Sequence, residues 1–225
     1  MVNATVPGDT APYGPSVNGH AGATKPRIAD LFCGAGGAGM GLHRAGFEVV
    51  GFDLQPQPNY PFEFHQADAL GVDLGGFDAV WASPPCQAYS TITRDKAIHP
   101  DLYIPTRQLL IESQKPYIIE NVLGAPYDSG IILCGSMFNM RVRRHRNFET
   151  SWMMFRPQCR HQEQGRPITV TGHGGGKPCR HSDRGVRSEW PIVMGMPWAS
   201  PKECTQAIPP AYSQYIGNRL MTVLS

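Results

Sequence analysis

Short apolar runs alternate with stretches of helical periodicity from Arg27 onward, and this alternation predicts an α/β fold. Runs rich in β-branched and aromatic residues predict five strands, at 28–32, 47–54, 64–67, 79–82 and 117–122, and two more near 130–134 and 147–150. A glycine-rich turn at 34–41 opens a helix that ends at Gly46, and further helices are expected at 102–113, 201–207 and 210–220. Strands separated by short helices indicate a parallel sheet with helices on both faces.

The alternating pattern disappears at the start of the chain and again after its middle. Residues 1–25 are rich in Ala, Gly, Pro, Thr and Asn without periodicity, and they are predicted to form a disordered tail. Between 151 and 190, Gly, Pro, Arg, His and Cys replace the apolar runs, which indicates a small irregular insert. Residues 26–150 are therefore expected to form the main domain, to which the segment 191–225 returns.

The composition agrees with one main domain. The 225 residues are 41% hydrophobic, which is enough for a core, and no run approaches the roughly 18 apolar residues that a membrane span needs. The amino-terminus lacks the charged-then-apolar pattern of a secretory signal. Six cysteines scattered over a chain of this length indicate reduced thiols in a cytosol-like compartment rather than a disulfide framework.

The net charge of +2 is small, but basic residues gather late in the chain. Residues 141–187 contain eleven Arg or Lys, nearly all of them arginine, against three Asp or Glu. Because a guanidinium group binds phosphate in bidentate geometry, this basic block predicts contact with a polyanion. An ordinary solvated face is the alternative interpretation.

A cysteine follows the predicted strand at 79–82. Cys86 comes directly after Pro84 and Pro85, which fix the backbone and hold the sulfur in a defined direction. A cysteine needed only for packing is more typical inside an apolar run. Cys86 is therefore a candidate nucleophile.

A second candidate site begins where the first predicted strand ends. The segment 30–37 passes from strand to helix through a glycine-rich turn, where a ligand can approach the backbone and free N–H groups are available. Asp53 ends the second strand, where a carboxylate can accept both ribose hydroxyls, and Asp68 follows the third strand, where it could bind an adenine amino group. Together these features outline a nucleoside pocket. The residues expected to bind the cofactor there are Asp30, Phe32, Gly34, Gly36, Gly37, Asp53, Asp68 and Pro84.

Taken together, the motifs resemble those of the cytosine-5 DNA methyltransferases, from about residue 27 to residue 218. The segment 30–37 is similar to the family's S-adenosylmethionine loop. The residues that carry the rest of the resemblance are Pro84-Pro85-Cys86-Gln87 for the nucleophile motif, Glu120-Asn121-Val122 for the Glu-Asn-Val motif, and Arg144-His145-Arg146 for the end of the Gln-x-Arg-x-Arg motif. The order and spacing of these motifs make a chance resemblance improbable.

The resemblance implies a Rossmann-like S-adenosylmethionine methyltransferase sheet and a covalent mechanism. Cys86 would add to C6 of cytosine, so that C5 can attack the methyl group of S-adenosyl-L-methionine. Glu120 would bind N3 and the exocyclic amine, a role that favours a raised carboxyl pKa. Arg146 would bind the cytosine O2 with Arg144 as its support, and the pKa of Cys86 is expected to be lowered by arginine, by the sulfonium of the cofactor, or by both.

The implied partner is double-stranded DNA, from which the target cytosine must be flipped. The stretch 87–99 could close over the flipped base. We expect a monomer in the cytoplasm of a bacterial or phage-infected cell, of a compact phage-encoded or solitary form. Two alternatives stay open: methylation of cytosine in RNA, and a catalytically silent DNA-binding relative.

Some positions depart from the family's pattern. Val142 stands where Gln is usual, Gln206 stands where Asn is usual in the late motif, and the insert 151–190 is shorter than the usual target-recognition domain. Sequence specificity could therefore be short or loose. No metal is assigned to the catalytic site, but a repeated Cys-x-His pattern could bind one zinc ion, with the ligands Cys159, His161, Cys179 and His181.

Overall fold

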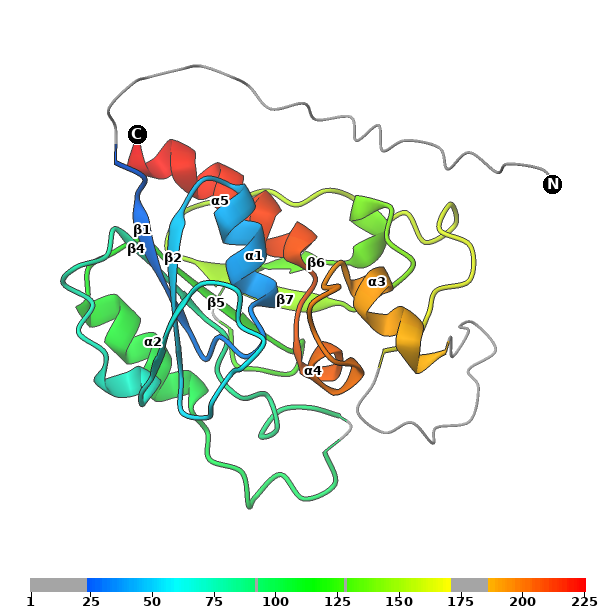
Figure 1. Ribbon diagram of the computed structural model, residues 1–225, viewed down its shortest axis with the longest axis horizontal. Coiled ribbons are helices and arrows are strands. Elements are labelled where there is room, and N and C mark those ends of the chain that lie inside the picture. The colour runs from blue at the N-terminus through cyan, green and yellow to red at the C-terminus, as the bar shows by residue number, and fades with distance from the viewer. Residues whose placement is uncertain (1–23, 92, 128, 171–185) are drawn as a thin grey trace.

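The computed structural model describes residues 24–91, 93–127, 129–170 and 186–225. A seven-stranded sheet lies at its centre, in the order β3-β2-β1-β4-β5-β7-β6 (Figure 1). The strands are β1 (Arg27–Leu31), β2 (Glu48–Asp53), β3 (Glu63–Gln66), β4 (Ala79–Ala82), β5 (Tyr117–Asn121), β6 (Ile131–Leu133) and β7 (Arg146–Thr150). Every strand expected from the apolar runs is present, and most bounds agree within one residue.

Five α-helices accompany the sheet among the described residues: α1 (Gly37–Arg44), α2 (Tyr103–Glu112), α3 (Trp190–Met194), α4 (Pro201–Gln206) and α5 (Pro210–Leu224). Three single turns of 3₁₀-helix connect them: η1 (Ala69–Gly71), η2 (Gly135–Phe138) and η3 (Arg187–Glu189). The helices predicted at 102–113, 201–207 and 210–220 are confirmed. Pro201 and Pro210 each begin a helix, where a residue without an N–H costs no hydrogen bond.

Strands β3, β2, β1, β4 and β5 run parallel, but β7 runs antiparallel to both β5 and β6. The prediction of a wholly parallel sheet is therefore wrong at this edge. A parallel pair needs a long crossover, usually through a helix. Between β6 and β7 the chain contains only a loop and the short η2, so the two strands pair as antiparallel neighbours.

The two faces of the sheet are covered by different helices. Side chains alternate along a strand, so Ile28 of β1 lies in one core cluster with residues of α1 and α5, and Ala29 lies in a second cluster with residues of α2. Figure 1 shows α1 and α5 side by side on one side of the strands and α2 on the other. The fold is thus a three-layer α/β sandwich, as predicted.

The carboxy-terminal segment closes the structure around a third, smaller core cluster. Met194, Met196 and Cys204 pack there against Val142 and against apolar residues of the segment 168–170. The described residues 151–165 contain no helix or strand, but η3 and the first residue of α3 fall within the predicted bounds 151–190 of the insert. Residues 1–23 of the predicted tail, together with Cys179 and His181 of the zinc pattern, lie outside the described residues.

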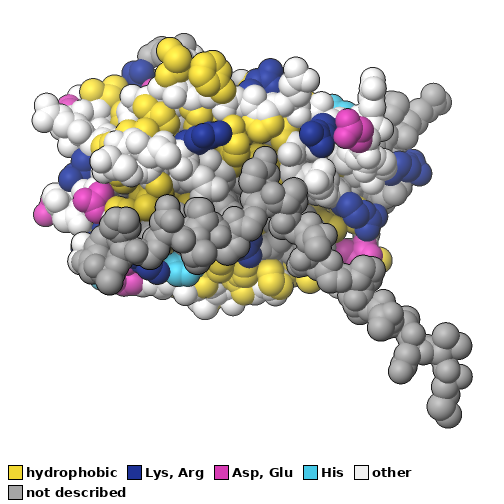
Figure 2. Space-filling model, turned by 90° about the horizontal axis from the view of Figure 1, so that it is seen from above, with side chains coloured by type: hydrophobic (Ala, Val, Ile, Leu, Met, Phe, Trp, Pro, Cys, Tyr) yellow, Lys and Arg dark blue, Asp and Glu magenta, His cyan; other side chains and the backbone are white. Residues whose placement is uncertain are grey.

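Among the described residues, no helix has both the length and the apolar character that crossing a bilayer requires. Figure 2 views the molecule from the side opposite to the loop that follows β4. On the visible part of that side formed by described residues, Lys and Arg side chains are scattered among uncharged ones rather than gathered into one patch. The charged residues that matter for the site lie elsewhere.

Candidate active site

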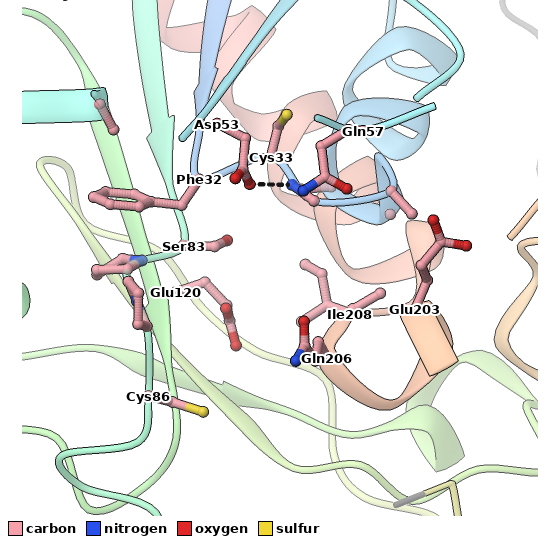
Figure 3. A pocket seen from close by; sticks show the side chains of 18 of the residues that line it. Phe32, Cys33, Asp53, Gln57, Ser83, Cys86, Glu120, Glu203, Gln206 and Ile208 are labelled. Atoms are coloured by element: carbon pink, nitrogen blue, oxygen red, sulfur yellow. Dashed lines mark hydrogen bonds between the residues drawn. The ribbon is translucent and has the colours of Figure 1, made fainter. Parts of the chain in front are cut away.

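Chemistry-bearing residues follow β1, β2, β4 and β5, and the carboxyl ends of these four strands meet at one edge of the sheet. The chain leaves β1 toward β2 on one side and continues from β4 on the other, which makes this edge a switch point where ligands commonly bind. A cavity of about 460 Å³ lies there. Figure 3 shows Asp53 at one end of this cavity, Cys86 at the other, and Gln206 and Ile208 on the wall opposite Glu120.

The glycine-rich turn after β1 forms one wall of the cavity. Phe32, Gly34 and Gly36 all have positive φ, at 56°, 49° and 79°. A Cβ on Gly34 would meet no atom within 4 Å, whereas a Cβ on Gly36 would lie 2.8 Å from a side-chain carbon of Pro61. Gly34 therefore leaves space open to a ligand, and Gly36 allows the turn to pack against the segment that follows β2.

Asp53 locks this turn from the end of β2. Its carboxylate accepts hydrogen bonds from the backbone N–H groups of Gly34 at 3.0 Å and Gln55 at 2.9 Å. Trp198 holds the turn from the other side, because its indole N–H donates to the carbonyl of Ala35 at 2.8 Å. The turn is thus fixed by side chains from both halves of the chain.

Six of the eight residues predicted to bind the cofactor line this cavity: Phe32, Gly34, Gly37, Asp53, Asp68 and Pro84. Gly36 and Asp30 are not among the lining residues. Asp30 is fully buried behind the turn, where it accepts a hydrogen bond from the hydroxyl of Tyr60 at 3.1 Å. Burial also raises the pKa of Asp30 to about 8. Because its side chain lies behind the turn and bonds Tyr60, Asp30 shapes the turn rather than the wall of the cavity.

The loop that carries Cys86 is fixed to β1 and β5. The N–H of Ser83 donates to the carbonyl of Leu31 at 3.1 Å, and the side-chain amide of Asn121 donates to the carbonyl of Pro84 at 2.8 Å. Beyond the prolines, the carbonyl of Cys86 accepts from the N–H groups of Tyr89 and Ser90, at 3.0 and 2.9 Å. The sulfur therefore leaves a backbone that is anchored on both sides.

Glu120 lies at the end of β5, and the guanidinium of Arg146 contacts its carboxylate with an Nε–Oε1 distance of 3.1 Å. Ser83 also hydrogen-bonds this carboxylate, and its Oγ accepts from the indole N–H of Trp81 at 2.9 Å. Burial raises the pKa of Glu120 although both nearby arginines oppose the shift. The predicted raised pKa is confirmed.

Arg144 and Arg146 come from the start of β7, and the structure gives them different surroundings. Arg144 is held by protein groups, since its guanidinium donates to the carbonyls of Val170 and Thr205, and its own carbonyl accepts from Tyr212. Burial, together with the charge of Arg146, lowers the pKa of Arg144 to about 9. Arg144 is therefore built in as a support, and Arg146 is the arginine that faces Glu120.

The expectation that the pKa of Cys86 is lowered is wrong for the protein by itself. Burial raises the pKa of this thiol, the charge of Glu120 adds to the shift, and Arg146 and Arg144 offset only part of it. At neutral pH the thiol is therefore mainly protonated. Further positive charge beside the sulfur, or a proton acceptor, is needed to form the thiolate.

A wider groove of about 1330 Å³ adjoins the cavity. Cys86 and Arg146 line both spaces, and so does Gln206 of the late motif. The stretch 87–99 forms one side of the groove, where it contributes Tyr89 and Arg94 among others. The candidate nucleophile thus lies where the cavity meets a wider surface groove.

Sequence reasoning did not assign roles to Ser83 and Asn121. Both act on residues that it did assign: Ser83 contacts Glu120, and Asn121 fixes the loop of Cys86. Asn121 offered a signal, because an amide at the end of an apolar strand is unusual unless its hydrogen bonds are satisfied. Ser83 gave no comparable signal.

Residues 26–125, a little under half of the chain, match the family described as C-5 cytosine-specific DNA methylase. We call residues 26–125 the methylase segment after this match. The methylase segment includes the glycine turn, Cys86 and Glu120, whereas Arg144 and Arg146 lie beyond it.

One curated relative is the type II methyltransferase M.AgeI of Thalassovita gelatinovora, which is 35% identical over 126 aligned residues. The alignment covers 46% of this chain but only 29% of M.AgeI, so the chain spans less than a third of that protein's length. The shared part is thus a fraction of a larger enzyme.

Solved structures share the fold of this chain. Dnmt2 methyltransferase of S. pombe matches with a TM-score of 0.58 at 13% identity, over 89% of this chain and 99% of that one. A DNA modification methyltransferase encoded within a prophage of E. coli matches with a TM-score of 0.57 at 14% identity, over 89% and 99% of the two chains. At such identities the likeness concerns the fold alone.

Proposed function

We propose that this protein is a DNA (cytosine-5-)-methyltransferase that uses S-adenosyl-L-methionine and forms a covalent bond from Cys86 to the target base. One observation carries the proposal. Cys86 lines both the cavity and the wider groove, and the ion pair of buried Glu120 and half-buried Arg146 lines the cavity with it. A reaction that transfers a group from a small cofactor to one base of a polymer needs a site for each of them, with the nucleophile between the two.

The residues of the cavity fit the cofactor. Its volume of about 460 Å³ falls in the range of roughly 300–1,000 Å³ that small-molecule sites occupy. Gly34 leaves the space into which a side chain would project, and Asp53 and Asp68 lie on the wall where hydroxyl and amino groups need acceptors. When bound, the cofactor supplies the methyl group that C5 accepts and places a positive sulfonium charge in the cavity.

The groove fits a polyanion whose target base is turned toward Cys86. Its lining includes Arg94, Arg143, Arg144 and Arg146, with Asp95 as its single carboxylate among the described residues. Flipping a base from a duplex costs a few kcal/mol, which contacts along this basic lining must offset. One chain supplies both the cavity and the groove, so a monomer is sufficient.

Cys86, Glu120 and Arg146 divide the chemistry at the base. The Cys86 thiol loses its proton and its sulfur bonds to C6, which moves electron density toward C5 and N3 of the ring. Glu120, with its raised pKa, shares a proton with N3 and so neutralises the developing charge, while Arg146 turns from Glu120 to the cytosine O2. Once C5 carries the methyl group, it loses its proton to water, and the C6–S bond breaks so that the thiolate returns.

A mechanism-based trap tests the proposal. Duplex DNA that contains 5-fluorocytosine should form a stable covalent adduct with the protein in the presence of cofactor, because fluorine at C5 cannot leave as a proton does. Cys86→Ser should abolish the adduct but retain binding of the labelled cofactor. Cys204→Ser changes a buried cysteine of the third core cluster that does not line the cavity, so it is the matched control and should trap normally.

The same assay separates the other candidates. Methyl transfer to tRNA or single-stranded RNA but not to duplex DNA would replace the proposal by RNA cytosine-5 methylation. Binding of DNA without adduct or methyl transfer to any nucleic acid would make the protein a silent relative. Retention of turnover by Cys86→Ser would contradict the covalent mechanism itself.

A further inference from the structure

Two thiols and two imidazoles converge beside β6 and β7. Cys134 directly follows β6, His145 directly precedes β7, and Cys159 and His161 come from the irregular segment after β7. One ligand atom from each of the four lies within 4.8 Å of all the others. Among the described residues, this is the only group of three or more His, Cys, Asp or Glu with such geometry.

The spacing is that of tetrahedral coordination. Zinc–sulfur bonds of about 2.3 Å and zinc–nitrogen bonds of about 2.0–2.1 Å place neighbouring ligand atoms about 3.3–3.8 Å apart. The Sγ of Cys134 lies 3.2 Å from Nε2 of His161, and the Sγ of Cys159 lies 3.8 Å from Nε2 of His145. The longest separation in the group exceeds the tetrahedral value by only about 1 Å.

From this arrangement we infer that Cys134, His145, Cys159 and His161 form a structural zinc site. Two cysteines and two histidines are a typical closed ligand set for zinc. Two thiolates balance the charge of the divalent ion and the two imidazoles are neutral, so the occupied site carries no net charge. All four positions are filled by side chains, which leaves no open position for catalysis.

The segment from residue 153 to residue 165 needs such a staple. It has no helix or strand, and its large apolar side chains Met153 and Phe155 are 85% and 80% exposed, so it has little core of its own. Polar contacts hold it to the loop between β6 and β7: the N–H of Arg160 donates to Ser136 at 3.1 Å, and the side chain of Gln164 accepts from Arg143 at 2.8 Å. A metal at the cluster would convert these weak contacts into a fixed junction.

The zinc site also reaches the arginines of the candidate active site. His145 is the residue between Arg144 and Arg146, so a metal bond to its ring fixes the backbone from which both guanidinium groups extend. The ligand set differs from the one that the sequence pattern predicts. Cys159 and His161 are retained, and Cys134 and His145 take the places of Cys179 and His181, which lie outside the described residues.

Metal content of the full chain tests the inference without any assay of methyl transfer. Protein purified under reducing conditions without chelator should contain about one zinc per chain by mass spectrometry of the metal. Cys159→Ser and His145→Asn should each lose most of the zinc. Cys204→Ser and the double variant Cys179→Ser/His181→Asn should keep it.

Cobalt provides a second readout that does not depend on how well a variant binds zinc. Cobalt-loaded protein should show the strong visible bands of tetrahedral coordination and a thiolate charge-transfer band, and Cys159→Ser should weaken the latter by about half because one of two thiolates is removed. Loss of metal from Cys179→Ser/His181→Asn, with retention by His145→Asn, would overturn the ligand set. Native protein that takes up neither metal, or that holds Cys134 and Cys159 as a disulfide after purification under reducing conditions, would overturn the site.

Discussion

Asn121 offers a test of what holds the nucleophile in place. Its side chain is 1% exposed, donates to the carbonyl of Pro84 at 2.8 Å, and accepts from the N–H of Val122 at 2.8 Å. Asn121→Ala removes both hydrogen bonds and leaves a buried carbonyl without its partner, which costs about 1–3 kcal/mol. For a chain of this size, each kcal/mol lowers the melting temperature by about 2–4 °C, so a decrease of about 2–12 °C is expected.

The functional effect of Asn121→Ala should exceed its effect on stability. Pro84 lies two residues before Cys86, so release of its carbonyl lets the sulfur move, and a misplacement of about 1 Å can cost about 100-fold in rate. The rate of adduct formation with 5-fluorocytosine DNA should fall by about 10- to 100-fold, with cofactor affinity nearly unchanged. Stopped reactions separated on denaturing gels measure the first quantity, and calorimetry measures the second.

Asn147→Ala is the matched control for this experiment. Asn147 also accepts from the N–H of the next residue, at 2.9 Å, and it lies opposite Asn121 in β7, but among the described residues its side chain forms no hydrogen bond with the loop of Cys86. It should lose stability without losing the adduct rate. Wild-type rates in Asn121→Ala, or equal losses in both variants, would refute the conclusion that Asn121 positions the nucleophile.

Three further outcomes follow from the same geometry. Burial raises the pKa of Cys86, and Arg146 offsets part of the shift. The rate at which iodoacetamide alkylates Cys86 in the free protein should therefore rise with pH up to and beyond the ordinary pKa of a thiol, and it should be slower in Arg146→Gln at every pH in that range. A plateau of the Cys86 rate near neutral pH would contradict this. Gly34→Ala should fold with its free energy of unfolding lowered by about 1–2 kcal/mol, since a φ of 49° is strained for alanine. It should bind the cofactor at least tenfold more weakly in calorimetry, because the new methyl group enters the cavity. Unchanged affinity would place the cofactor elsewhere. Asp30 binds its proton more tightly in the folded than in the unfolded chain, so its contribution to stability is present below about pH 4 and is lost as pH rises toward about 8. The free energy of unfolding of Asp30→Asn, measured by urea titration, should lack this decline. An unchanged decline in the variant would assign it to other groups.

The sequence predicted the elements of the fold well because apolar periodicity reports directly on burial. The strands at 79–82 and 117–122 and the helix at 102–113 are examples, with bounds within a residue of the structure. The direction of β7 could not be predicted in this way, because periodicity is the same for a parallel and an antiparallel strand. Only the short connection from β6 carried that information.

The pKa values and contacts of the site residues were harder to predict from the sequence than which residues form the site. The motifs brought Cys86, Glu120 and Arg146 together correctly, but the pKa of Cys86 depends on burial and on the balance of three neighbouring charges, which no motif encodes. Asp30 was assigned to the ligand because it borders the glycine turn, and its side chain instead lies behind that turn against Tyr60. Cys134 and His145 were not linked to Cys159 because they meet only after β6 and β7 have paired.

The reversal of β7 decides which end of that strand serves the reaction centre. An antiparallel strand begins at the edge where its parallel neighbours finish, so Arg146 enters the sheet beside the final residues of β5, with Arg144 just before it. Had β7 run the other way, its five residues at about 3.3 Å each would have moved both guanidinium groups by roughly 16 Å, to the opposite end of the strand. The antiparallel direction of β7 thus places Arg144 and Arg146, which lie outside the methylase segment, beside Cys86 and Glu120, which lie inside it.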